Sequence, residues 1–329
     1  MAALISALKV TVLMCVSQRY RFSLSGGIIG LEKAGLPNKM LLRLRKMIHE
    51  PHGLLLVTGP TGSGKTTTLY GALNELNSHQ KKIITVEDPV EYRLPRVNQV
   101  QVHPNIGLDF STVLRATLRQ DPDILLVGEI RDKETADIAL RAAMTGHFVL
   151  STLHTNDAVS SAMRLTDIGI EGYLVASALN GILAQRLVRK ICENCTQEYF
   201  PSDAERLWLD ARGEELGLDE ISLQKGRGCT YCNNTGYKGR TGIFELLEIN
   251  EHMADALRRN DSAAFTIAAK TDPHYQPLAY SALELAIAGK TTLDEVFRVT
   301  EQLDESIYLD APEVAAESSS IASGGLELE

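Results

Sequence analysis

The sequence predicts an α/β fold in which helices flank a mainly parallel β-sheet. Three observations carry this prediction. Short apolar runs alternate with segments of helical periodicity between about residues 54 and 168, as strands and helices do in a parallel sheet. Hydrophobic residues make up 44% of the 329 residues and charged residues 23%, which allows a packed core and excludes global disorder. At roughly 100–200 residues per domain, the length indicates two domains, or one large domain with an appendage.

The first predicted helix begins at Asn38, a residue that can cap it, and ends near Glu50, where Pro51 stops it. The apolar run at 54–58 is typical of a buried strand and leads into a glycine-rich turn. Further strands are expected at 83–86, 124–127 and 148–152, and helices at 65–76, 109–120, 133–144 and 157–168. The alternation stops after Arg189, and later helices are expected near 254–259, 279–288 and 292–301.

A phosphate-binding loop is predicted directly after the first strand. Residues 59–66 read GPTGSGKT and match G-x-x-x-x-G-K-[ST] at every fixed position. Glycines let backbone N–H groups curl around a polyphosphate, and the following helix adds its positive N-terminal end. Lys65 would reach the β- and γ-phosphates, and the Thr66 hydroxyl would hold Mg²⁺. The expected nucleotide-binding residues are Gly59, Pro60, Thr61, Gly62, Ser63, Gly64, Lys65, Thr66 and Thr67.

Acidic residues follow two of the predicted strands. Glu129 ends the strand at 124–127, where it can meet Mg²⁺ or its waters. The acid pair usual at this place is replaced by Gly128-Glu129. Past the strand at 83–86, either Glu87 or Glu91 could orient the attacking water, although isolated acids are more often solvated or paired with a cation.

A histidine follows a third strand. His154 lies just beyond 148–152, where an imidazole can hydrogen-bond a γ-phosphate and respond to its loss. The alternative is a purely structural histidine, which is the commoner role of a lone histidine.

Four motifs therefore stand in one order along the chain: the glycine-rich loop, the acidic segment 84–92, the strand with its Gly-Glu ending at 123–132, and the histidine segment 145–157. This arrangement resembles the type II secretion and type IV pilus assembly ATPases, the GspE/PulE family, which carry a Walker A box, an aspartate box, an atypical Walker B box and a histidine box. The resemblance continues through 183–192 and 229–245 and covers about residues 27–300.

The resemblance implies a RecA-like P-loop ATPase domain preceded by a smaller PAS-like domain, with six subunits in a ring and ATP and Mg²⁺ as ligands. It makes Glu91, the second glutamate of the aspartate box, the base that acts on water. It makes Glu129 the Walker B glutamate and His154 the histidine-box residue. Lys65 completes the expected catalytic set.

Four of the five cysteines form two C-x-x-C pairs, Cys192 with Cys195 and Cys229 with Cys232. Four thiolates can hold one tetrahedral Zn²⁺ in a closed, structural site. The gap between the pairs exceeds that of an ordinary zinc ribbon. The family resemblance supports zinc, since assembly-type members often carry this element and retraction motors generally lack it. The fifth, Cys15, is expected to be a small buried hydrophobe.

The expected domain order is a remnant of the PAS-like domain with its linker at 1–30, the ATPase core at 31–190, a tetracysteine zinc-binding subdomain at 191–245, a C-terminal helical region at 246–310 and a disordered acidic tail at 311–329. Because the family's preceding domain is longer than the segment available here, the chain resembles an N-terminally shortened member. The arginines that complete the ATP site do not map onto this sequence; the candidates are Arg19, Arg21, Arg115 and Arg119.

The charge distribution separates the functional hypotheses. The formal net charge is −9, residues 1–50 carry a net +6, and residues 301–329 hold eight acids and no base. An acidic chain argues against a zinc-ribbon-containing, nucleic-acid-dependent ATPase. A retraction-type motor is a further alternative. The complete set of Lys65, Thr66, Glu91 and Glu129 argues against a ring scaffold that binds ATP without hydrolysing it. The leading hypothesis is ATP hydrolysis that powers assembly of type IV pili or of the type II secretion pseudopilus.

The expected partners are other copies of the chain, an inner-membrane platform protein and a cytoplasmic docking protein, with no nucleic acid. No window of about 20 residues is uniformly apolar, so no spanning helix is predicted. Lys9 lies within the apolar start and not before it, unlike the order in a signal peptide. We therefore expect a cytoplasmic location, peripheral at the inner membrane of a bacterium.

Overall fold

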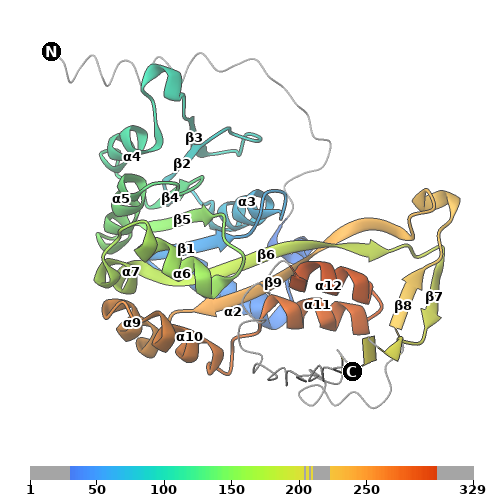
Figure 1. The fold of residues 1–329 in the computed structure, drawn as a ribbon. Coiled ribbons are helices and arrows are strands. Elements are labelled where there is room, and N and C mark those ends of the chain that lie inside the picture. The colour runs from blue at the N-terminus through green and yellow to red at the C-terminus, as the bar shows by residue number, and fades with distance from the viewer. Residues whose placement is uncertain (1–29, 204, 207–208, 210–222, 302–329) are drawn as a thin grey trace, which may run out of the picture.

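A seven-stranded sheet forms the centre of the protein (Figure 1). The computed structural model describes residues 30–203, 205–206, 209 and 223–301. The strand order is β3-β2-β4-β5-β1-β6-β9, parallel throughout except for β9, which pairs antiparallel with β6. The predicted mainly parallel α/β fold is thereby confirmed. The strands of this sheet are β1 (Gly53–Thr58), β2 (Ile83–Glu87), β3 (Val97–Gln101), β4 (Ile124–Val127), β5 (Phe148–Leu153), β6 (Leu179–Ile191) and β9 (Tyr237–Glu248).

Strand β1 shows why the sheet is covered on both faces. All six of its residues are buried, and successive side chains point to opposite sides. Leu54 and Leu56 join a cluster that contains residues of the later helices, whereas Leu55 and Val57 join a second cluster that contains residues of the first two α-helices. Burial on both faces requires an unbroken apolar run, and this run is the feature that identified the strand in the sequence.

The helices lie close to their predicted positions. Three of those that follow strands begin at an aspartate whose carboxylate accepts a backbone N–H of the first turn: Asp109, Asp132 and Asp157. Each such cap stabilises its helix by about 1 kcal/mol. The helical elements are η1 (Leu31–Ala34), α2 (Asn38–Ile48), α3 (Lys65–Leu76), η2 (Pro104–Ile106), α4 (Phe110–Leu118), α5 (Lys133–Met144), α6 (Ala158–Asp167), α7 (Gly172–Ala178), η3 (Thr230–Cys232), α9 (Glu251–Arg258), α10 (Ser262–Lys270), α11 (Leu278–Ile287) and α12 (Leu293–Glu301).

Strands β6 and β9 form a long antiparallel ribbon that extends beyond the other strands of the sheet (Figure 1), and Cys192 directly follows β6. A small second sheet of β7 (Thr196–Tyr199) and β8 (Leu223–Gly226) lies beyond it. Helix α12 supports the ribbon through Glu295, a fully buried carboxylate that accepts hydrogen bonds from Arg189 on β6 and from Arg298. The sequence did not predict this ribbon, since its residues lack a clear period-two alternation.

Several expectations fall on residues that the structure does not describe. The remnant of the preceding domain at 1–30 and the acidic tail at 311–329 lie almost wholly outside the described residues, as do Cys15, Arg19 and Arg21.

Within the described part of the chain, none of the helices combines the length and apolar character that a membrane span requires.

Candidate functional site

The strand order brings the four sequence motifs to one edge of the sheet. Strands β2, β4, β5 and β1 are neighbours and run parallel, so their carboxyl ends meet along the same edge. The aspartate box follows β2, Glu129 follows β4, His154 follows β5, and the glycine-rich loop follows β1. Crevices outside the carboxyl ends of parallel strands are where open α/β sheets bind ligands.

The glycine-rich loop joins β1 to α3 with Gly59, Gly62 and Gly64 in the positive-φ region, which side chains disfavour. A Cβ on Gly59 would lie 2.2 Å from the backbone oxygen of Gln185. The Lys65 ammonium donates to the carbonyl oxygens of Gly59 at 2.6 Å and Pro60 at 3.1 Å. Burial lowers the pKa of Lys65, and the negative charge of Glu129 opposes that shift. Carbonyl oxygens of the loop thus hold the Lys65 ammonium, which lies within electrostatic range of the Glu129 carboxylate.

Strand β6 supports this loop through Gln185, a residue to which the sequence assigned no role. Its buried side-chain oxygen accepts a hydrogen bond from Thr68 Oγ1 at 2.7 Å. A Cβ on Gly64 would lie 2.9 Å from its amide nitrogen. The sequence could not assign this role, because the pairing of β6 with β1 joins segments far apart in the chain. Its one signal was that residues 183–192 continue the family resemblance.

Glu129 is the centre of a cluster of charged side chains. Its carboxylate, 12% exposed, lies 3.2 Å from His154 Nε2 and 2.5 Å from the Arg131 guanidinium. The hydrogen bond to Glu129 raises the pKa of Arg131, and the charge of Asp88 adds to the effect. The structure therefore brings Glu129 and His154 into contact and places Lys65 within electrostatic range of Glu129. Arg131 was missed, although it stands two residues after Glu129.

Gly128 explains the unusual Gly-Glu ending of β4. Its N–H donates to the Val86 carbonyl at 2.8 Å. A Cβ at this position would lie 3.1 Å from that carbonyl oxygen and 3.3 Å from Glu87 Cα. A side chain here would require the end of β2 to move by a few tenths of an ångström, so the close approach of β2 favours glycine over a second acid.

The structure distinguishes the two glutamates of the aspartate box. Glu87 is 4% exposed, and its carboxylate accepts hydrogen bonds from the Tyr70 and Thr85 hydroxyls and, at 3.2 Å, from Gln99 Nε2. A carboxylate occupied in this way has little access to water. Glu91 is exposed, so the geometry favours it for contact with water.

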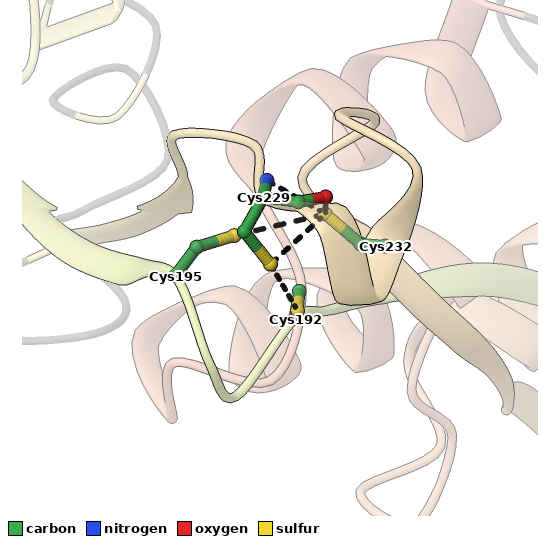
Figure 2. Close-up of side chains that lie close together, drawn as sticks. All are labelled: Cys192, Cys195, Cys229 and Cys232. Atoms are coloured by element: carbon green, nitrogen blue, oxygen red, sulfur yellow. Dashed lines mark hydrogen bonds between the residues drawn. The ribbon is translucent and has the colours of Figure 1, made fainter.

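The four cysteines of the two C-x-x-C pairs converge at the end of the ribbon (Figure 2). Their Sγ atoms all lie within 4.8 Å of one another, with separations of 3.9, 3.8 and 3.7 Å for three of the pairs. A regular tetrahedron with Zn–S bonds of about 2.3 Å has S···S edges of about 3.8 Å. Against the effect of burial, backbone N–H donors from Cys229 and Gly236 lower the pKa of Cys232, whereas burial raises the pKa of Cys195. The donor set fits one Zn²⁺.

The two arginine candidates within the described residues lie elsewhere. Arg115 and Arg119 line a groove of about 350 Å³ between α4 and α5, together with Arg141. Arg115 pairs with Glu134 at 2.9 Å. No residue of the glycine-rich loop lines this groove.

Comparison with known proteins identifies the family. A family model described as "Type II/IV secretion system protein" matches residues 5–298. The chain belongs to the type II/IV secretion system protein family. A relative in this family, type II secretion system protein E of Dickeya dadantii, is 47% identical over 275 residues, 83% of this chain and 54% of that protein. Type II secretion system ATPase E of Vibrio cholerae is 46% identical over 260 residues, 78% of this chain and 50% of that protein. The chain spans about half the length of these curated relatives.

Solved structures agree with the family assignment. The pilus retraction motor PilT with bound ADP has a TM-score of 0.62 at 32% identity, covering 84% of this chain and 68% of that one. The Legionella pneumophila ATPase DotB has a TM-score of 0.60 at 22% identity, covering 83% and 66%, a likeness that concerns the fold alone. The predicted resemblance to secretion and pilus ATPases is confirmed.

Proposed function

We propose that the chain binds ATP with Mg²⁺ at the glycine-rich loop and hydrolyses it. One observation carries the proposal: at the carboxyl ends of neighbouring parallel strands, Glu129 contacts His154 and lies within electrostatic range of Lys65. Lys65 and the loop N–H groups bind the phosphates, and Lys65 stabilises the charge that develops on the γ-phosphoryl group. The hydroxyl of Thr66 and the carboxylate of Glu129 are hard oxygen ligands that suit Mg²⁺, which when bound neutralises phosphate charge.

Glu91 orients the attacking water and takes its proton. Two observations support this choice: its carboxylate is exposed, and the other glutamate of the box, Glu87, is buried and occupied by three donors. His154 contacts Glu129, so it can respond when the γ-phosphate leaves. An imidazole hydrogen-bonded to a carboxylate is suited to that exchange of partners.

The cysteine cluster holds one structural Zn²⁺. The support is the tetrahedral S···S spacing and the burial of three of the four thiols. Four thiolates leave no open coordination position, so the metal fixes the end of the β6–β9 ribbon and takes no part in ATP chemistry.

The work of hydrolysis drives assembly of type IV pili or of a type II secretion pseudopilus. The names of the secretion relatives support this, and so does the cysteine cluster, which the family resemblance links to assembly motors. In this proposal the full-length protein forms a six-membered ring on the cytoplasmic side of the inner membrane. It acts on an inner-membrane platform protein through a cytoplasmic docking protein. The domain division at residues 30, 190, 245 and 310 belongs to the same proposal.

Replacement of Glu129 by Gln tests the hydrolytic mechanism. Steady-state ATPase activity should fall by about 100-fold or more, as expected when a positioned charged group is lost, while a fluorescent ATP analogue still binds. Glu134→Gln is the matched control, because Glu134 is an exposed glutamate paired with Arg115 outside the site. Equal turnover in Glu129→Gln and the parent protein would refute the mechanism.

A further inference from the structure

The nucleotide-binding helix carries a buried tyrosine one turn after the proposed magnesium ligand. Thr66 and Tyr70 are four residues apart on α3, so they lie on the same side of the helix. Tyr70 is fully buried, and its ring meets that of Tyr92 edge to face, with 4.6 Å between the centroids. Movement of the start of α3 therefore carries Tyr70 with it.

The Tyr70 hydroxyl reaches across to the aspartate box. It donates to Glu87, the last residue of β2. Burial and this bond to Glu87 raise the pKa of Tyr70, whereas the nearby backbone amide of Glu91 lowers it. One hydroxyl on α3 thus interacts with both ends of the segment from Glu87 to Glu91.

Gln99 on β3 secures the other side of the same segment. Its amide nitrogen lies within hydrogen-bond distance of Glu87 at 3.2 Å, of the Tyr92 carbonyl at 3.1 Å and of the Tyr70 hydroxyl at 3.3 Å. Its side-chain oxygen accepts the Leu94 N–H at 2.7 Å. Glu91 lies in a loop whose flanks are held by Gln99 and by Tyr70, while its own side chain extends to solvent.

We propose that Tyr70 is a positioning residue that fixes the loop bearing Glu91 relative to the nucleotide-binding helix. The inference rests on the proposed role of Glu91 as the base. The physical reason is geometric: a displacement of about 1 Å at a reacting group can cost roughly 100-fold in rate. A base on an exposed loop needs its backbone held by something that also holds the phosphates, and Tyr70 belongs to the helix that does so.

The Tyr70→Phe variant removes only the hydroxyl and keeps the buried ring. We expect kcat to fall by about 10-fold or more with KM for ATP within about twofold, because the phosphate-binding residues are untouched. Tyr199→Phe is the matched control, since Tyr199 also donates to a glutamate, Glu205 at 3.1 Å, but in the cysteine-bearing region. This control should retain the parent kcat.

Two further measurements separate positioning from general destabilisation. In a Glu91→Gln background, Tyr70→Phe should cost little additional kcat, because both changes act on the same group. Trypsin should also cleave after Arg96, in the exposed part of this loop, and this cleavage should be several-fold faster in Tyr70→Phe than in Tyr199→Phe. The cleavage rate measures opening of the loop and does not depend on ATP hydrolysis.

The outcomes are distinguishable. Full additivity with Glu91→Gln, or parent kcat and parent cleavage rate in Tyr70→Phe, overturns the inference and leaves the proposed function intact. Parent kcat in Glu91→Gln overturns the proposed role of Glu91 and the inference with it. If the parent chain shows no ATPase activity, the proposed function fails in this chain, and the cleavage rates still decide whether Tyr70 holds the loop.

Discussion

The close contact at Gly128 gives a sharp test of how the site is built. In Gly128→Ala the new methyl carbon would meet the Val86 oxygen at 3.1 Å and Glu87 Cα at 3.3 Å, whereas carbon atoms pack best at about 3.5–4.0 Å. Since both contacts are backbone atoms, the ends of β4 and β2 must separate by a few tenths of an ångström. Such overpacking costs about 1–3 kcal/mol, and the lower entropy of unfolded alanine offsets about 0.4–1 kcal/mol of it.

The net loss of unfolding free energy is therefore roughly 0–2.6 kcal/mol, or up to about 10 °C in Tm by thermal denaturation. The separation also moves Glu129 relative to the aspartate box, so we expect kcat for ATP hydrolysis to fall by about 10-fold or more. Gly30→Ala is the matched control, because Gly30 has a φ of −64° and nothing lies within 4 Å of an added Cβ. The reasoning is refuted if Gly128→Ala matches Gly30→Ala in both Tm and turnover.

Three further predictions test other parts of the structure. Gln185→Ala should lower the unfolding free energy by about 1–3 kcal/mol, since Thr68 loses a buried acceptor, and should raise the Kd for ATP in equilibrium binding; an unchanged Kd would remove the role of β6 under the loop. Elemental analysis should find about one zinc per parent chain, little in Cys232→Ser and an unchanged content in Cys15→Ser; a metal-free parent protein would contradict the zinc site. Burial disfavours the Glu295 carboxylate, but hydrogen bonds from arginine side chains outweigh this and lower its pKa to about 2 from an ordinary 4.5. The parent should therefore be more stable than Glu295→Gln, with the full difference in unfolding free energy above about pH 5 and its loss as the pH falls toward 2. Urea denaturation at a series of pH values measures this difference. A pH-independent difference would show that Glu295 is not held ionised.

Local features of the sequence were enough for the elements nearest the site. The run Leu54–Thr58 followed by GPTGSGKT predicts a strand, a turn and the start of a helix from consecutive residues alone. Strand β3, which reads VNQVQ, contains too few apolar residues for a similar prediction. The roles of Gln185 and of the two glutamates of the aspartate box, by contrast, depend on contacts between distant segments.

The two glutamates of the aspartate box illustrate that limit. Glu87 and Glu91 are both acidic residues of the segment at the end of the predicted strand 83–86, and the sequence alone did not decide between them. Their difference arises from Tyr70 and Gln99, which come from α3 and β3 and bury one of the two carboxylates. Gly128 is a similar case, because the space that a side chain would need there is taken up by the backbone of β2, which is distant in the sequence.

The ribbon of β6 and β9 has a mechanical consequence. On β6, Gln185 accepts a hydrogen bond from Thr68 in the first turn of α3, directly after the glycine-rich loop. Cys192 lies seven residues farther on, a length of about 24 Å at 3.4 Å per residue. Acting as a stiff arm of that length, the ribbon would displace the cysteines by about 0.4 Å for each degree that it tilts at the loop. With the proposed Zn²⁺ bound, four thiolates at the tip would keep the two strands from fraying, so a tilt at the loop would displace the tip instead of bending the ribbon.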